Sequence, residues 1–222
     1  MTAENQYYSG ISRGEDRPSK SFFYRNFFKR PLDILLVVLS SPFVVPVIIV
    51  FAAMIMLDGG NPFYSQERVG RKGNTYRIWK LRSMVKNAEQ RLDAYLAEDP
   101  AAAMEWASTQ KLRDDPRVTG IGRFLRRSSM DELPQLWNVL KGEMSLVGPR
   151  PMMTSQRDFY AGTAYYSLRP GITGFWQVSD RNGTTFSARA IYDDVYDRNL
   201  SFLNDVSIMF RTVWVVLRAT GC

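Results

Sequence analysis

The sequence contains no histidine among its 222 residues, and its single cysteine is Cys222. These absences exclude a histidine general base, a Ser-His or Cys-His nucleophile pair, and zinc sites built from histidine and cysteine. One cysteine also excludes a framework of intrachain disulfides and is compatible with the cytosol. Any chemistry must therefore use carboxylates, hydroxyls and cations.

The charges are unbalanced, with 29 Lys and Arg against 22 Asp and Glu, which gives a net charge of +7. This excess suits nucleic acid, an anionic membrane surface or phosphorylated substrates, and a solvated basic surface gives the same count. Placement favours the membrane or phosphates, because Arg25, Lys29 and Arg30 precede an apolar run and basic residues within 68–72 follow it. A chain of this length with 45% apolar residues can bury one core and form one or two domains.

Residues 34–57 form an uncharged run of 24 residues, long enough at ~1.5 Å per residue to cross a hydrocarbon core of ~30 Å. Pro42 and Pro46 near its middle favour a kink or a break, and Ser40 and Ser41 can bond the backbone groups that this frees. Both flanks are basic, so the positive-inside rule gives no preference for opposite sides. The residues alone leave open a crossing helix and a re-entrant helix that turns at Ser41-Pro42.

The segments around this run have simpler patterns. Residues 1–24 are predicted to be a disordered tail, and no cleavage pattern of a signal peptide follows a short apolar region. After Gly60 the composition becomes that of a soluble domain, beginning with a predicted β-hairpin of residues 64–69 and 76–81. Lys80 and Arg82 alternate with apolar residues and are expected to share one strand face, which is either solvated or directed at a ligand.

Two further helical regions follow from apolar periodicity. Residues 84–98 predict an amphipathic helix that stops at Asp99-Pro100, and residues 101–112 predict a second helix. The tail of residues 200–217 is too interrupted by charge to span a bilayer. It suits an interfacial helix with Trp214 at headgroup depth, and a buried amphipathic helix explains the same pattern.

The most informative segment is SSMDELPQLWNVLKGEMSLVGPRP, residues 128–151, with the adjacent carboxylates Asp131 and Glu132. Ser129 and Glu132 fit a capping box, and Pro134 is acceptable only near the first turn of a helix. A helix is therefore expected to start close to the acidic pair. Backbone N–H groups at a helix start favour anions and keep a carboxylate ionised.

This segment closely resembles the central motif of the bacterial sugar transferases, which are monotopic phosphoglycosyl transferases that start polysaccharide assembly on a polyprenyl phosphate. The resemblance covers about nine tenths of the chain. Residues 101–116 most resemble the branch that transfers galactosyl phosphate for exopolysaccharides. The matching segments are KRPLDILLVVLSSP (29–42), NPFYSQERVGRKGNTYRIWKLRSM (61–84), DDPRVTGIGRFLRRSSMDELPQLWNVLKGEMSLVGPRP (114–151), LRPGITGFWQVSDRNGTTF (168–186) and YDDVYDRNLSFLNDVSIMF (192–210).

The resemblance implies a catalytic dyad. Asp131 is expected to attack the β-phosphate of a UDP-sugar, expel UMP and carry a phospho-sugar that undecaprenyl phosphate then accepts. Glu132 is expected to help hold a metal and position phosphate. Because a carboxylate attacking a diphosphate meets strong repulsion, Mg²⁺ held by Asp131 and Glu132 is expected as cofactor.

Cationic side chains should provide the remaining stabilisation through forked hydrogen bonds to phosphate. The resemblance implies that Lys80 and Arg82 point toward the phosphates. Arg150 lies in the rigid segment Gly148-Pro149-Arg150-Pro151, and Arg169 and Arg181 lie in glycine-containing loops, so these three are further candidates. Arg126 is an alternative partner in a structural ion pair, and Trp176 has three open roles: stacking on uracil, resting on lipid, or core packing.

The predicted fold is α/β, mainly helical with a small hairpin or sheet. Its predicted parts are the tail (1–24), a re-entrant membrane helix broken at Ser41-Pro42 (25–58), which the resemblance favours over a crossing helix, and a cytosolic catalytic domain with interfacial helices (59–222).

The expected location is the cytoplasmic face of a bacterial inner membrane. The expected partners are UDP-galactose or UDP-glucose, undecaprenyl phosphate and the bilayer, with no nucleic acid, and a homodimer is compatible with this assignment. Two other classes are an inactive membrane scaffold and a glycosyltransferase that releases UDP.

Overall fold

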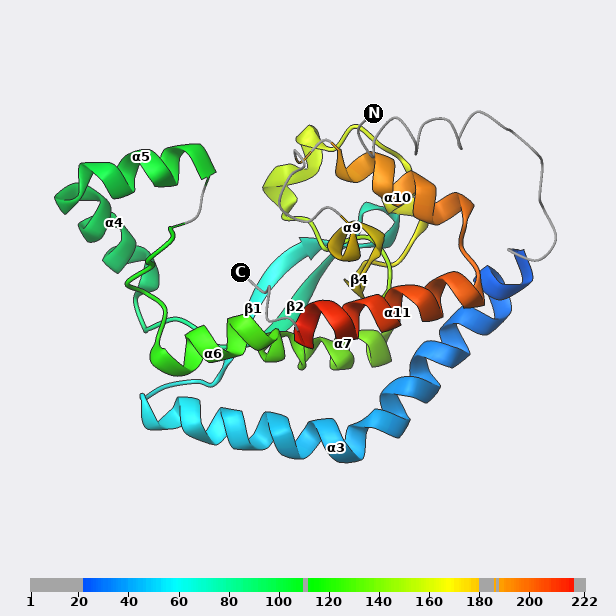
Figure 1. The fold of residues 1–222 in the computed structure, drawn as a ribbon, viewed down its shortest axis with the longest axis horizontal. Helices are drawn as coiled ribbons and strands as arrows, with labels where there is room; N and C mark the ends of the chain where they lie inside the picture. Colours follow the sequence, from blue (N-terminus) through cyan, green and yellow to red (C-terminus); the bar gives the residue numbers. More distant parts are fainter. Residues whose placement is uncertain (1–21, 110–111, 180–185, 187, 218–222) are drawn as a thin grey trace.

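The computed structural model describes residues 22–109, 112–179, 186 and 188–217. The fold is mainly helical, with two small sheets near its centre (Figure 1). The predicted tail up to residue 21 lies outside the described residues. The helices are η1 (Tyr24–Phe28), α3 (Lys29–Leu57), η2 (Arg71–Gly73), α4 (Ala88–Glu98), α5 (Pro100–Thr109), α6 (Gly120–Ser128), η3 (Met130–Glu132), α7 (Gln135–Lys141), η4 (Thr154–Phe159), α8 (Ala164–Ser167), α9 (Phe175–Val178), α10 (Arg189–Arg198) and α11 (Phe202–Leu217), and the strands are β1 (Phe63–Val69), β2 (Thr75–Leu81), β3 (Ser145–Val147) and β4 (Gly171–Thr173).

The long apolar helix α3 continues through both of its prolines and bends in its middle (Figure 1). Pro42 has no N–H for the carbonyl of Val38, four residues earlier, and Ser41 Oγ donates to that carbonyl instead at 2.7 Å. The predicted break at Ser41-Pro42 is therefore wrong in one respect: the backbone stays helical there. The predicted role of the serines in bonding freed backbone groups is confirmed for Ser41.

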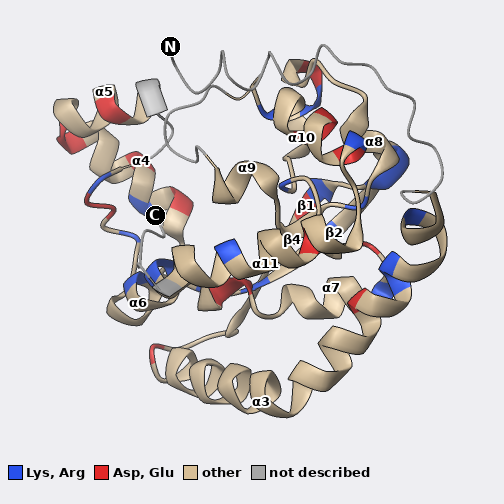
Figure 2. Ribbon diagram, turned by 45° about the vertical axis from the view of Figure 1, so that its right-hand side comes forward, with Lys and Arg blue, Asp and Glu red and all other residues tan. Residues whose placement is uncertain are grey.

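Most of α3 is exposed and apolar. It is long enough to cross a membrane, and only 6% of its most apolar window is buried within the protein. A core helix of a soluble protein would be mostly buried, so this exposure indicates contact with lipid. In Figure 2 the apolar length of α3 carries no charged residue, and basic residues appear at the end that follows η1.

Both ends of α3 are held by the rest of the protein through arginines that bond terminal carbonyl groups. Arg30, in the first turn of α3, donates to the carbonyls of Val139 and Leu140 at 2.5 and 2.9 Å, in the last turn of α7. Arg82, just after β2, donates to the carbonyls of Ile55 and Gly59 at 3.1 and 2.7 Å, at the end of α3. The last carbonyls of a helix lack partners within it, and a cation there also opposes the negative end of the helix dipole.

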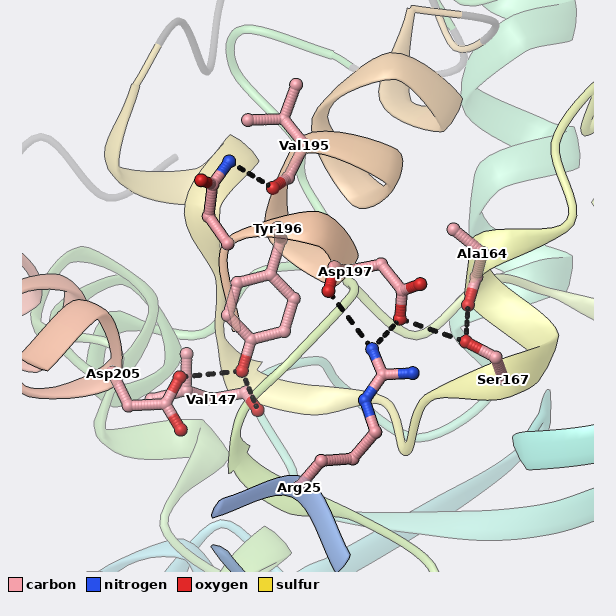
Figure 3. Close-up of polar contacts among 9 residues, drawn as sticks. Arg25, Val147, Ala164, Ser167, Val195, Tyr196, Asp197 and Asp205 are labelled. Carbon is pink, nitrogen blue, oxygen red and sulfur yellow. Dashed lines mark hydrogen bonds and ion pairs between the residues drawn. The ribbon is translucent and has the colours of Figure 1, made fainter. Parts of the chain in front are cut away.

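The first turns of α3 are also attached through a buried carboxylate on α11. Asp205 accepts hydrogen bonds from Tyr24 Oη at 2.8 Å and Tyr196 Oη at 2.7 Å, and it pairs with Lys29 Nζ at 2.6 Å. Figure 3 shows the Tyr196 contact, and beside it Arg25 paired with Asp197, which Ser167 Oγ also contacts at 3.0 Å. This network joins the start of the membrane helix to α10 and α11.

The described residues form two small sheets, one from β1 and β2 and one from β3 and β4. β1 and β2 form an antiparallel pair with Tyr64 opposite Lys80, which confirms the predicted hairpin. β3 and β4 form a short parallel pair, Ser145 opposite Gly171. Val37 of α3 packs with residues of β2 and α7, and Ile55 packs with Leu81 and Leu125, so both halves of α3 contribute to the core.

The remaining helices agree with the sequence patterns except at their ends. α4 begins at Ala88 and not at Met84, because Met84 pairs with Val118 in an isolated bridge. α4 ends before Asp99, whose Oδ1 accepts the N–H groups of residues 101 and 102 and so caps α5. The two helices project from the rest of the molecule (Figure 1). α11 combines both expected patterns, because Ile208 is buried while Phe210 and Trp214 are exposed.

The Asp205 network gives a first prediction. Asp205→Asn removes a buried carboxylate from Lys29 and leaves that cation without its partner, so we expect a loss of about 3 kcal/mol or more in the free energy of unfolding. The control, Asp194→Asn, removes the exposed ion pair with Arg198 and should cost less than about 1 kcal/mol. Denaturant unfolding in detergent micelles measures both changes. Equal effects of the two substitutions would show that the buried network does not hold the domain.

Candidate active site

The acidic dyad lies on a single 3₁₀ turn, η3, between α6 and α7. Ser129, just before it, has a left-handed backbone with φ 56°, and its N–H bonds the last carbonyls of α6. The predicted capping box is wrong, because the side chain of Ser129 makes no bond to the following turn. Ser129 instead ends α6, and in the turn that follows Asp131 is buried and Glu132 is half-buried. The expected helix start close to the pair is confirmed, since α7 begins at Gln135 after Pro134.

Lys80 forms ion pairs with both acids of the dyad. Its Nζ lies 2.8 Å from Oε1 of Glu132 and 3.6 Å from Oδ2 of Asp131. The strand pairing in the hairpin fixes this position, because Lys80 is the second to last residue of β2. Lys80, which was predicted to contact substrate phosphates, therefore lies beside the acidic pair.

The environment shifts the protonation of Asp131. Burial raises the pKa of Asp131, the positive charge of Lys80 lowers it, the neighbouring Glu132 raises it, and Arg126 lowers it. Arg126 itself lies on α6 and donates from Nε to Ser83 Oγ at 2.9 Å. Burial lowers the pKa of Arg126, while the charge of Asp131 raises it. Asp131 is thus a desolvated carboxylate whose ionised form depends on two nearby cations.

A cavity of about 450 Å³ opens beside the dyad. Cationic side chains dominate its charged lining: Arg68, Lys80, Arg117, Arg126, Arg150 and Arg189, against the acidic Asp115 and Glu132. Asp115 already bonds Arg117 through two hydrogen bonds, from Nε at 2.8 Å and Nη2 at 2.7 Å. The cavity therefore carries a positive excess, which suits phosphorylated ligands.

The predicted phosphate-binding residues divide into two groups. Lys80 and Arg150 line the cavity. Arg82 does not, because it bonds the end of α3, and Arg169 does not, because its Nε donates to the carbonyl of Gly142 at 3.0 Å. Lys80 and Arg82, which were expected to point toward one ligand, therefore differ in their contacts, since Lys80 pairs with the dyad and Arg82 bonds carbonyls at the end of α3. Arg181 lies outside the described residues.

Four arginines that the sequence did not identify as phosphate ligands line the cavity. Arg68 comes from β1, Arg117 from the segment before α6, Arg126 from α6 and Arg189 from α10. The alternation in β1 gave a weak signal for Arg68, because every second residue of a strand shares a face. No signal in the sequence placed Arg189, since its position depends on how α10 packs.

The dyad has the composition of a magnesium site completed by substrate. Mg²⁺ is commonly held by one or two carboxylates together with phosphate oxygens and water. Asp131 and Glu132 provide two adjacent carboxylates, and within the described residues no group of three or more potential metal ligands occurs. The donor set therefore fits an ion that is completed by a bound phosphate.

A second cavity of about 450 Å³ reaches the dyad from the apolar side of the protein. Phe43, Val44 and Val47 of α3 line it, with Val215 and Val216 of α11. Glu132 and Arg150 line both this cavity and the cation-rich one. Glu132, next to the buried Asp131, thus lies where a polar cavity meets an apolar cavity walled by α3.

A buried carboxylate beside cations, next to an exposed apolar helix, is typical of a membrane-associated protein that handles phosphorylated substrates. A sequence profile of the bacterial sugar transferase family matches residues 24–219. The chain therefore belongs to the bacterial sugar transferase family.

Several curated relatives align with nearly the whole chain. The undecaprenyl-phosphate galactose phosphotransferase of Salmonella typhimurium is 44% identical over 197 residues, 88% of this chain and 41% of that protein. The exopolysaccharide production protein ExoY of Rhizobium meliloti is 38% identical over 222 residues, 99% of this chain and 96% of that protein. The UDP-glucose:undecaprenyl-phosphate glucose-1-phosphate transferase of Caulobacter vibrioides is 38% identical over 197 residues, 83% of this chain and 68% of that protein. The chain spans about two fifths of the length of the relatives that match it at 44 to 45% identity.

The electrostatics of the dyad give a second prediction. Because Lys80 lowers the pKa of Asp131 and Glu132 raises it, Lys80→Met should raise that pKa and Glu132→Gln should lower it. Carboxyl ¹³C titration by NMR, with Asp131→Asn to assign the signal, measures both shifts. Lys141→Met is the control, since Lys141 pairs with Glu143 on the surface. Shifts of the same sign in both dyad variants would contradict the assigned environment.

Proposed function

We propose that this protein transfers a hexose 1-phosphate from a UDP-sugar to undecaprenyl phosphate and releases UMP. One observation carries the proposal: Glu132, the neighbour of the buried Asp131, lines both a cation-rich cavity and an apolar cavity walled by α3. A nucleotide sugar is soluble and charged, whereas a lipid phosphate carries a long apolar chain. The cation-lined cavity suits the first, and the apolar cavity suits the second. The names of the relatives support the same substrates.

In the first step, Oδ of Asp131 attacks the β-phosphorus of the UDP-sugar. The bond from that phosphorus to the bridging oxygen breaks, and its electron pair leaves with UMP. The phospho-sugar is then joined to Asp131 as an acyl phosphate. Lys80 and Arg126 stabilise the ionised nucleophile before attack, and Arg150 balances charge on the phosphates.

In the second step, an oxygen of undecaprenyl phosphate attacks the same phosphorus, and the bond from phosphorus to the Asp131 oxygen breaks. The carboxylate is regenerated, and the sugar is left joined to the lipid by a diphosphate. Because Glu132 and Arg150 line both cavities, they are placed to contact the donor in one step and the acceptor in the other. Donor and acceptor therefore react in turn at one site, which predicts ping-pong kinetics.

Mg²⁺ is the proposed cofactor, held by Asp131 and Glu132, where it would neutralise phosphate charge during both steps. UDP-galactose is the first choice of donor and UDP-glucose the second, since relatives are named for galactose and for glucose. The product would begin the assembly of an exopolysaccharide or an O-antigen.

We also propose that α3 is re-entrant and that the protein lies on the cytoplasmic face of the inner membrane. Arg30 and Arg82 attach opposite ends of α3 to the same domain, and Val37 and Ile55 pack into its core. A helix that crossed ~30 Å of hydrocarbon would carry one of these attachments into or beyond the bilayer. A bent helix inserted in one leaflet keeps both attachments on the same side.

The nucleophile gives a third prediction. Asp131→Asn nearly preserves shape but removes the attacking carboxylate, so we expect turnover to fall at least about a thousandfold while folding and membrane attachment are retained. Extraction of labelled lipid after incubation with UDP-galactose measures turnover. Asp194→Asn, an exposed substitution, is the matched control. Retained activity in Asp131→Asn would remove Asp131 from this role.

Two measurements on the unsubstituted protein separate the proposal from its alternatives. Separation of nucleotides should show UMP, whereas a transferase that moves the sugar alone releases UDP and an inactive scaffold releases neither. Mass spectrometry of protein quenched with donor alone should show a hexose phosphate on the peptide that contains Asp131. Release of UDP, or an unmodified peptide, would rule out the covalent route.

The topology gives a fourth prediction. In a Cys222→Ser background, single cysteines at Lys20 and Asn61 flank the membrane helix. We expect both to resist a membrane-impermeant maleimide in intact spheroplasts and both to react after permeabilisation. Labelling of only one of them in intact spheroplasts would show that α3 crosses the membrane.

A further inference from the structure

Three arginines from separate parts of the chain converge on the cation-lined cavity at Trp176. The guanidinium of Arg189 lies 4.3 Å from the centroid of the Trp176 ring, and that of Arg150 lies 5.9 Å from it. Arg68 lines the same cavity from β1. Arg189 comes from α10 and Arg150 from the loop after β3, so only the tertiary fold brings the three together. We call Arg68, Arg150 and Arg189 the arginine cluster.

The arginine cluster lacks a matching negative charge. No ion pair forms between it and any acid among the described residues. Burial lowers the pKa of Arg68, and the charge of Arg150 lowers it further. Burial, followed by Arg150, lowers the pKa of Arg189 to about 10. The acid beside Arg189 is Asp193, whose pKa burial raises to about 7, so it is only partly ionised at neutral pH. The positive charges of the three arginines therefore repel one another until an anion binds.

Two donors of the arginine cluster are buried and unused. Nε of Arg68 and Nε of Arg189 have no hydrogen-bond partner in the described structure. Arg68 uses Nη2 to bond Gln66, at 2.7 Å, but its Nε points elsewhere. Buried N–H groups in native proteins are nearly always satisfied, and a phosphate offers several acceptors to forked guanidinium groups. Unused donors and uncompensated charge both indicate an anion with several oxygens.

The position of the arginine cluster distinguishes the donor from the acceptor. Only Arg150 of the three lines the apolar cavity beside α3, whereas Arg68 and Arg189 line only the cation-rich cavity among these two. A lipid phosphate that enters along α3 would meet Glu132 and Arg150 first. Arg68 and Arg189 line the cation-rich cavity, whose polar lining suits a soluble nucleotide better than a lipid chain.

From this geometry we propose that Arg68, Arg150 and Arg189 bind the phosphate of a nucleoside monophosphate, the leaving group of the reaction. The inference rests on the proposed function and adds a subsite to it: Asp131 receives the sugar-bearing phosphoryl group, and the arginine cluster holds the other phosphate. Arg150 contacts both regions, because it also lines the cavity at Glu132. Charge that develops on the departing UMP is thereby stabilised as the bond to phosphorus breaks.

The test measures nucleotide binding and not turnover. Isothermal titration of UMP, uridine and a short-chain prenyl phosphate against the full chain in nanodiscs gives three affinities. In Arg68→Gln and Arg189→Gln we expect UMP to bind at least about tenfold more weakly, with uridine and prenyl phosphate unchanged. Arg189→Lys keeps the charge without the fork and should recover part of the loss.

The matched control is Arg198→Gln on the same helix, since Arg198 is exposed and pairs with Asp194. It should leave all three affinities unchanged. Thermal unfolding shows whether each variant folds. If Arg189→Gln does not fold, Arg68→Gln and Arg189→Lys decide the test. Unchanged UMP affinity in the folded cluster variants would overturn the proposal, as would a loss of prenyl phosphate binding alone or no UMP binding by the unsubstituted protein.

The outcomes also separate this subsite from the proposed function. UMP binding that depends on the arginine cluster, with no phospho-sugar on Asp131, would keep the subsite and reject the covalent reaction. A trapped phospho-sugar with UMP binding indifferent to the cluster would keep the reaction and reject the subsite.

Discussion

The structure depends on buried carboxylates that tie the apolar helix α3 to the domain above it. Asp33, within α3, accepts hydrogen bonds from Ser145 Oγ at 2.7 Å and from the N–H of Leu146 at 3.1 Å, both on β3. Asp205 holds Lys29 at the start of the same helix. A buried charge without partners is strongly unfavourable, so these contacts fix the position of α3 more firmly than apolar packing alone. Arg150 follows shortly after β3, so the contacts between Asp33 and β3 also fix the position of Arg150 relative to α3.

The contacts that hold α3 in place also explain how the candidate site borders both a polar and an apolar cavity. The dyad lies on a single turn between α6 and α7, and α7 packs on α3 through an arginine and an apolar cluster. Lys80 approaches the dyad from the hairpin. Glu132, the neighbour of Asp131, thus lines both a cavity rich in charged groups and an apolar cavity. Burial raises the pKa of Asp131, whereas the charges of Lys80 and Arg126 lower it.

Local features of this fold can be predicted from the sequence, whereas the contacts that its arginines make cannot. Turn residues located the hairpin, Asp99-Pro100 located the boundary between α4 and α5, and Pro134 located the start of the helix after the dyad. Arg82 and Arg169 could not be placed, because the carbonyl groups that they bond become available only after the helices have packed. Arg189 joins the cavity through the packing of α10, and Ser129 ends α6 because the chain reverses there. Sequence patterns reveal local structure and the resemblance reveals the dyad, but long-range partners need the folded chain.

The bend in α3 has a mechanical consequence under the proposed topology. The uncharged parts of its two arms, residues 34–41 and 42–57, are about 12 and 24 Å long at ~1.5 Å per residue, and only the second exceeds a single leaflet of ~15 Å. The second arm must therefore lie obliquely, and the bent helix displaces lipid from one leaflet only. Such a wedge responds to the lateral pressure and curvature of that leaflet more than to the total thickness of the bilayer. The lipids that surround this protein thus act on the angle between its arms, and through Val44 and Val47 on the width of the apolar cavity.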